Sequence, residues 1–318
     1  MYSMQQTLEA FVFGESYEKK ECCPCHEVAE KFNALISLER KYQSRNYLYG
    51  GASVPMRAIV VDETCREKMC DWCYRTVDFF KLSRESAYVA MSCLDRFLST
   101  RDGSPFLMSN SLFQLACVTS LYISIKVLEP VELGIKMLIE VCRDSYSEKQ
   151  ILETERKILS AIRWAVNPPS PQAFVTLYTE MLPPCLSLTQ RRNIEGLVQY
   201  QLELSLLSYN STVRHKPSEL GLASMLNAMC LVPGVTQSIQ SMFFQSVREM
   251  SGCRNQGLGL ELSMSLLWKF LEYGYDNTPD IDLNSAGHSH SSNKCDSRRS
   301  FQMVKSSNII PPCVFSGR

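Results

Sequence analysis

The chain has 318 residues, of which 45% are hydrophobic and 21% are charged, and its formal net charge is zero. This is ordinary globular composition with enough residues for two domains, and the balanced charge argues against a nucleic-acid-binding protein. We expect neither a secretory signal nor a membrane-spanning helix, because the chain opens on MYSMQQTLEAFVFGESYEKK and contains no run of 18 apolar residues.

Helical spacing of apolar residues runs from about residue 27 to 273, whereas alternating strand patterns are hard to find. The sequence therefore predicts an all-α protein. A first helix is expected from residue 27 to about 43, followed by helices over 56–80, 84–99, 110–126, 131–143 and 148–163. After the proline-containing break at 167–171, five more are expected over 171–182, 188–209, 217–231, 235–251 and 258–273.

This order of helices predicts four parts of the chain. They are an N-terminal extension with one helix (1–50), two tandem five-helix domains (51–166 and 167–273), and a tail (274–318). The tail contains NSAGHSHSSNKCDSRRS, which is polar, serine-rich and aperiodic, so we expect it to be disordered. The duplication rests on helix count, because the residues of the two halves show no detectable repeat.

The segment CREKMCDWCYR spaces Cys65, Cys70 and Cys73 as the start of an iron–sulfur motif. On a helical wheel, however, these cysteines lie among apolar residues, opposite the charged ones. Free cysteine often packs as a small buried hydrophobe. We therefore expect core packing, with no metal and no cofactor. The fourteen scattered cysteines favour a reducing intracellular compartment. ECCPCH (21–26) and a pair of tail histidines are weaker metal candidates.

Four charged residues fall where apolar ones are expected. Arg66 projects into the apolar side of its helix, and Asp95 lies within a helix that is apolar nearly all round. Because a lone buried charge costs several kcal/mol, we expect these two to form one internal ion pair.

Lys126 ends a long uncharged helix, and Glu155 lies on the apolar stripe of the helix that Ser147 and Gln150 open as a capping box. Two interpretations stay open. Either the two charges pair and are inert, or they border a surface that receives a partner.

At these residues the chain resembles the cyclins. CREKMCDWCYRTVDFFKLSRESAYVAMSCLDRFLS resembles the family's MRxxLxDW segment running into its LDRFLS helix, and LFQLACVTSLYISIK its long central helix. SEKQILETERKILSAIRWAV resembles the fifth helix, PPSPQAFVTLY the linker, and YQLELSLLSYNSTVRHKPSELGLASML part of a second cyclin box. VPMRAIVVDE (54–63) offers Arg57 as an alternative match to the opening arginine, but counting back from the later motif favours Arg66.

The resemblance implies two tandem five-helix cyclin boxes and a non-catalytic subunit that activates a cyclin-dependent Ser/Thr kinase. Five family positions fall on Arg66, Asp95, Leu115, Lys126 and Glu155, of which Leu115, Lys126 and Glu155 would bind the kinase. Such a protein would act in cell-cycle control in the nucleus or cytoplasm, as a heterodimer with the kinase and without nucleic acid or membrane. The alternatives are a cyclin-fold transcription factor, which predicts a basic surface, and a helical scaffold that affects no kinase.

Further features implied by the resemblance concern substrates and regulation. The family's substrate-docking surface maps to Met69, Trp72 and Gln114, although Lys68 replaces an apolar residue there. The segment KVLEP keeps only Glu129 of the acidic residues that usually follow the lysine. In the tail, the segment around Thr278, TPDID, resembles a phosphorylation-dependent degradation signal.

Overall fold

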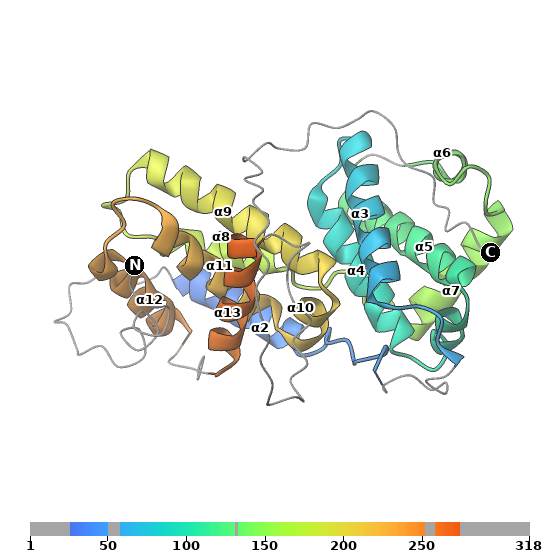
Figure 1. Cartoon of the computed structure of the whole chain (residues 1–318), viewed down its shortest axis with the longest axis horizontal. Helices are drawn as coiled ribbons and strands as arrows, with labels where there is room; N and C mark the ends of the chain where they lie inside the picture. The colour runs from blue at the N-terminus through green and yellow to red at the C-terminus, as the bar shows by residue number, and fades with distance from the viewer. Residues whose placement is uncertain (1–25, 50–57, 131–132, 252–257, 274–318) are drawn as a thin grey trace, which may run out of the picture.

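The computed structural model describes residues 26–49, 58–130, 133–251 and 258–273. All regular structure within these ranges is helical, without a strand. The predicted all-α class is confirmed. Figure 1 shows two groups of helices, one formed by α3 to α7 and the other by α8 to α13 together with α2.

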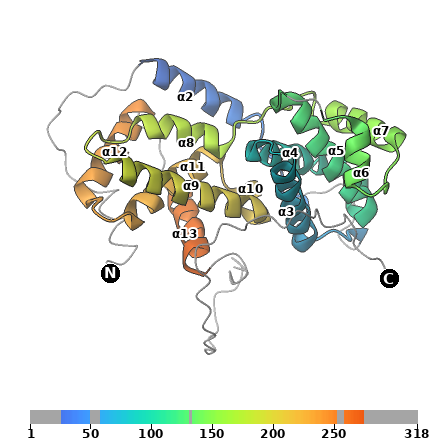
Figure 2. The same cartoon turned by 90° about the horizontal axis from the view of Figure 1, so that it is seen from above.

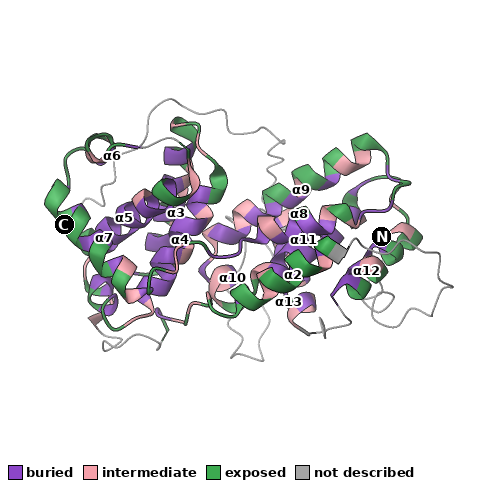
Figure 3. Ribbon diagram, turned by 180° about the vertical axis from the view of Figure 1, so that it is seen from behind, coloured by how far each residue is buried: buried purple, intermediate pink, exposed green. Residues whose placement is uncertain are grey.

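The first group is built around one central helix. Its members are α3 (Glu63–Phe79), α4 (Arg84–Leu98), the 3-10 helix η2 (Ser104–Met108), α5 (Asn110–Leu128), α6 (Ile135–Val141) and α7 (Glu148–Ala161). Helix α5 packs against α3, α4 and α7. Because it carries no charge before its last turn, it can be buried on nearly every side (Figure 3). In the described ranges α5 alone is long and apolar enough to cross a membrane, but 67% of that stretch is buried within the protein.

The second group repeats this plan around α11 (Pro217–Leu231), which packs against α8 (Pro171–Glu180), α9 (Leu188–Leu207) and α13 (Leu258–Tyr273). The short α10 (Tyr209–Arg214) and α12 (Gln237–Met250) complete it. The apolar side chains form two separate buried clusters, one in each group. The predicted tandem boxes and their boundaries remain predictions with which these two clusters are consistent. The tail lies outside the described residues.

The N-terminal helix α2 (His26–Glu39) packs on the second group, against α8, α11 and α12 (Figure 2). Phe32 is buried there, with its ring centroid 5.9 Å from that of Phe174 and 6.1 Å from that of Tyr178. From the end of α2 the chain passes to the first group, so residues 40–49 connect the two groups.

Most helices begin where side-chain caps dictate. The predicted capping box is confirmed, because Ser147 and Gln150 bond each other's backbone at the start of α7. Asp62 accepts a hydrogen bond from the backbone nitrogen of Cys65 and fixes the start of α3 at Glu63, so the predicted helix over 56–80 is wrong for residues 58–62. The short η2 and α10 were not predicted.

Candidate functional site

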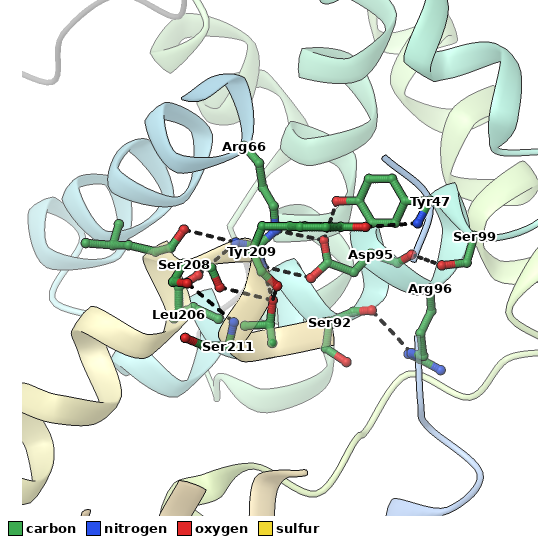
Figure 4. Close-up of polar contacts among 12 residues, drawn as sticks. Tyr47, Arg66, Ser92, Asp95, Arg96, Ser99, Leu206, Ser208, Tyr209 and Ser211 are labelled. Carbon is green, nitrogen blue, oxygen red and sulfur yellow. Dashed lines mark hydrogen bonds and ion pairs between the residues drawn. The ribbon is translucent and has the colours of Figure 1, made fainter. Parts of the chain in front are cut away.

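Arg66 of α3 and Asp95 of α4 form a buried, two-pronged ion pair (Figure 4). Nε and Nη2 of Arg66 donate to Oδ1 and Oδ2 of Asp95 at 2.9 and 2.8 Å, and the side chains are only 1% and 3% exposed. Burial disfavours the charged guanidinium, but Asp95 more than offsets it and raises the pKa of Arg66. The guanidinium is therefore charged, and the carboxyl group of Asp95 is its buried partner.

The same arginine reaches into the second group of helices. Its Nη1 donates to the carbonyl oxygens of Leu206 and Leu207 at 2.9 and 3.3 Å, where α9 ends, and Nη2 also donates to Thr212 Oγ1 at 3.0 Å. These carbonyls have no partner within their own helix. Arg66 therefore joins α3, α4 and the end of α9 at one point.

Two tyrosines complete this network. The hydroxyl of Tyr47 donates to Oδ1 of Asp95 at 2.7 Å. The hydroxyl of Tyr209 in α10 accepts from the backbone nitrogens of Tyr47 and Leu48 and donates to Oδ1 of Asn46. The network is therefore structural, because its members are directed at one another and hold the segment before α3 against both groups.

Lys126 and Glu155 form a second ion pair, at the surface. Lys126, in the last turn of α5, places Nζ 2.5 Å from Oε1 of Glu155 on α7, and 4.7 Å from the ring centroid of Tyr122. The lysine side chain is 44% exposed and the carboxylate 11%. The structure thus brings these predicted residues together and leaves the lysine accessible to a partner.

Exposed apolar side chains occur on the same two helices. Val127 follows Lys126, and Leu152 lies one turn before Glu155 on α7; they are 42% and 36% exposed. Trp164, just past the end of α7, is 72% exposed and has a φ of 60°. Its backbone nitrogen donates to the carbonyl of Leu159, which closes the helix. Trp164 was not among the predicted site residues, although an aromatic residue directly after the helix expected over 148–163 was a visible signal.

The remaining predicted partner contacts are buried. Leu115 is 5% exposed and belongs to the core of the first group, where it contributes to packing. Met69, Trp72 and Gln114, predicted to dock substrates, are also buried, and Gln114 Oε1 accepts from the hydroxyl of Tyr146 at 3.3 Å. The indole nitrogen of Trp72 makes no hydrogen bond to the described residues.

The thiols pack as the helical wheel predicts. Cys65, Cys70 and Cys73 are buried on α3, and Cys73 Sγ lies 3.7 Å from Cys117 Sγ of α5. Burial raises the pKa of Cys65, so its thiol stays protonated. No group of three potential metal ligands occurs in the described ranges. The other candidate metal-binding segments lie outside the described residues, apart from the backbone of His26. Arg57, the alternative match to the opening arginine, and Thr278 also lie outside the described residues.

Comparison with known proteins finds sequence similarity to cyclins. A family model described as "Cyclin, N-terminal domain" matches residues 30–167. A protein named "G2/mitotic-specific cyclin-1" from Antirrhinum majus is 29% identical over 170 residues, or 54% of this chain and 33% of the relative. One named "G2/mitotic-specific cyclin-B2" from Oryzias javanicus is 26% identical over 225 residues, or 70% of this chain and 53% of the relative. The chain spans about a third to a half of such relatives.

Among solved structures, a viral cyclin from herpesvirus saimiri has a TM-score of 0.51 and 14% sequence identity. The match covers 75% of this chain and 98% of the viral chain. At this identity the match shows a shared fold.

Proposed function

This chain belongs to the cyclin family, and from that premise we propose that it is a regulatory subunit that binds and activates a cyclin-dependent Ser/Thr protein kinase in cell-cycle control. We place this activity in the nucleus or cytoplasm. The observation that carries the proposal is the Lys126–Glu155 pair, which is accessible at the surface and accompanied by exposed apolar side chains on the same helices.

This surface has the composition of a partner-binding site. Val127 and Leu152 supply apolar area on the same two helices. Trp164, which follows α7, is exposed and of the residue type that most often dominates binding energy. Lys126 donates and Glu155 accepts, so together they can bond the polar backbone of a partner helix end or loop. Because the two are already paired in the free chain, binding exchanges one set of partners for another and leaves no buried charge unpaired.

The proposed mechanism requires no catalytic residue in this chain. A protein kinase is active when the glutamate of its αC helix pairs with the lysine of strand β3. A subunit that packs against αC and prefers this arrangement shifts the kinase population toward it. His215, the one histidine whose side chain the structure describes, has its Nδ1 2.7 Å from Ser263 Oγ and packs against α13.

The test is co-purification with cyclin-dependent kinases, followed by an assay of kinase activity. We expect the wild-type chain to bind and activate at least one such kinase. The double variant Lys126→Ala, Glu155→Ala should lose binding while keeping its helical circular dichroism.

The matched control is Lys149→Ala with Glu153→Ala, which removes an exposed pair one turn apart on α7. This control should bind and activate as the wild type does. Equal binding by both double variants would reject the proposed surface, and a wild-type chain that activates no cyclin-dependent kinase would reject the proposed function.

A further inference from the structure

A cleft of about 210 Å³ lies where α3, α4, α8 and α9 meet, between the two groups of helices. Its polar lining includes Tyr74 of α3, Arg84 and Tyr88 of α4, and Glu203 of α9, and its apolar lining includes the buried Leu202. Sites for drug-sized ligands usually measure 300–1,000 Å³. The size of this cleft therefore suits a side chain of a partner rather than a large cofactor.

The cleft already holds one guanidinium, that of Arg84. Its Nε and Nη2 donate to both oxygens of Asp78 at 2.9 and 2.7 Å, and Nη1 donates to Oε2 of Glu203. The guanidinium carbon also lies 5.4 Å from the centroid of the Tyr74 ring. A paired carboxylate, a second carboxylate and an aromatic face are the groups by which proteins recognise arginine. The groups around Arg84 are therefore of the kind that bind an arginine side chain.

The carboxylates exceed what Arg84 can neutralise. The lining of the cleft has one cation, Arg84, and two carboxylates, Glu85 and Glu203, which leaves one net negative charge there. Asp78, the other carboxylate paired with Arg84, lies outside the lining. The dipole of α4 accounts for Glu85, which lies in its first turn. The dipole of α4 does not account for Glu203, which lies near the end of α9 in the other group of helices. A second cation would complete the charge balance.

Two tyrosines also line the cleft. They are Tyr74, whose ring lies against the Arg84 guanidinium, and Tyr88 of α4. One carboxylate oxygen of Glu85 accepts from Ser170 Oγ at 2.5 Å, which orients the group. The cleft therefore presents an oriented acceptor, an aromatic ring and net negative charge.

We propose that this cleft binds an arginine side chain from a basic segment of a partner protein, between the ring of Tyr88 and the carboxylates of Glu85 and Glu203. Because its walls come from both groups of helices, the bound segment bridges them. The cleft involves α3, α4, α8 and α9, whereas the Lys126–Glu155 surface involves α5 and α7. This binding is therefore independent of the proposed kinase contact.

The test uses the full chain and a fluorescent six-residue peptide with two adjacent arginines flanked by serine and glycine. A second peptide carries citrulline, a neutral isostere, in place of both arginines. Fluorescence anisotropy at low ionic strength should show binding of the arginine peptide, with affinity at least about tenfold lower for the citrulline peptide. A similar loss is expected with the variant Glu85→Gln, Glu203→Gln, in which Asp78 still holds Arg84.

The matched control is Glu153→Gln with Glu195→Gln, which removes the same charge from exposed sites on α7 and α9 outside the cleft. This control should keep the wild-type affinity, and Tyr88→Leu, which removes the aromatic ring, should weaken binding without any change in net charge. Equal weakening by the two glutamine double variants would mean general charge attraction and would overturn the proposal. Failure of the wild-type chain to bind the arginine peptide, or unchanged affinity in Tyr88→Leu, would also overturn it.

Discussion

Glu39, the last residue of α2, accepts hydrogen bonds from the backbone nitrogen and the hydroxyl of Ser218 at 2.7 and 3.0 Å, although the two are 179 residues apart. Ser218 lies in the first turn of α11, whose N-cap residue, Lys216, supplies no side-chain acceptor for the backbone. Glu39 of α2 therefore caps the start of another helix, α11. This contact fixes the N-terminal helix α2 to α11 and the helices around it.

The contact predicts a specific pH dependence. Burial raises the pKa of Glu39 above 4.5 and outweighs the hydrogen bonds from Ser218. A raised pKa means that the folded protein holds this proton more tightly than the unfolded chain does, so the contribution is complete below about pH 4.5 and is lost as pH rises through the folded-state pKa. Relative to Glu39→Gln, the wild type should gain free energy of unfolding as the pH falls from neutral toward that range. Urea denaturation of both proteins at each pH measures the difference.

Glu180→Gln, which removes an exposed carboxyl group at the end of α8 in the same group of helices, is the control. It should track the wild type more closely than Glu39→Gln does. A difference between wild type and Glu39→Gln that is constant with pH, or that changes in the opposite direction, would contradict the assigned role of burial.

Breaking the Arg66–Asp95 pair should be strongly destabilising. Either Arg66→Ala or Asp95→Ala leaves one buried charge uncompensated, which costs about 3–5 kcal/mol of unfolding free energy. The double variant should cost less than the sum of the two single ones, because it leaves no unpaired charge. Chemical denaturation of all four proteins measures the coupling.

Arg75 and Asp71, an exposed ion pair one turn apart on the same helix, provide the comparison. Their side chains are about half exposed, so alanine at either position should change the unfolding free energy by less than about 1 kcal/mol. Additive losses at Arg66 and Asp95 would show that the two charges do not act as a pair.

Helical periodicity was sufficient to find the charged residues of both pairs. Arg66 and Asp95 stood out because each occupied an apolar position of its own helix, and such a residue must find a buried partner. Lys126 and Glu155 stood out in the same way, and the structure joins them as well. Periodicity could not show that Leu115 would be buried, because core and partner-binding residues share the same apolar side of a helix.

The contacts that connect distant segments were not predictable. Tyr47 lies in a non-helical segment without periodicity, and the carbonyl of Leu206 is available only because α9 ends there. Glu39 was indistinguishable from any other glutamate within the helix expected over 27–43, which in the structure ends at Glu39. Each of these contacts depends on how α2, α9 and α11 are placed in three dimensions, and local sequence patterns carry no such information.

Tyr47→Phe should separate the hydroxyl's contribution from that of the ring. The variant removes the 2.7 Å hydrogen bond to Asp95 and keeps the edge-on ring contact with Tyr209. Because the acceptor is charged and buried, we expect a loss of about 1.5–3 kcal/mol in unfolding free energy. Tyr49→Phe is the matched control, since its hydroxyl donates to Glu63 at the same distance but its side chain is largely exposed. Equal losses in the two variants would contradict a special role for the buried network.

Trp164→Ala should separate partner binding from folding, and this prediction rests on the proposed function. The side chain is 72% exposed in the free chain, so its removal should leave the unfolding free energy nearly unchanged. If Trp164 anchors the kinase, the same change should weaken binding by about 2 kcal/mol or more, which is at least a thirtyfold rise in Kd. Titration calorimetry with the purified kinase measures this loss. Leu188→Ala, 75% exposed on the second group, is the control and should bind normally. Wild-type affinity in Trp164→Ala would place the kinase contact elsewhere on the chain.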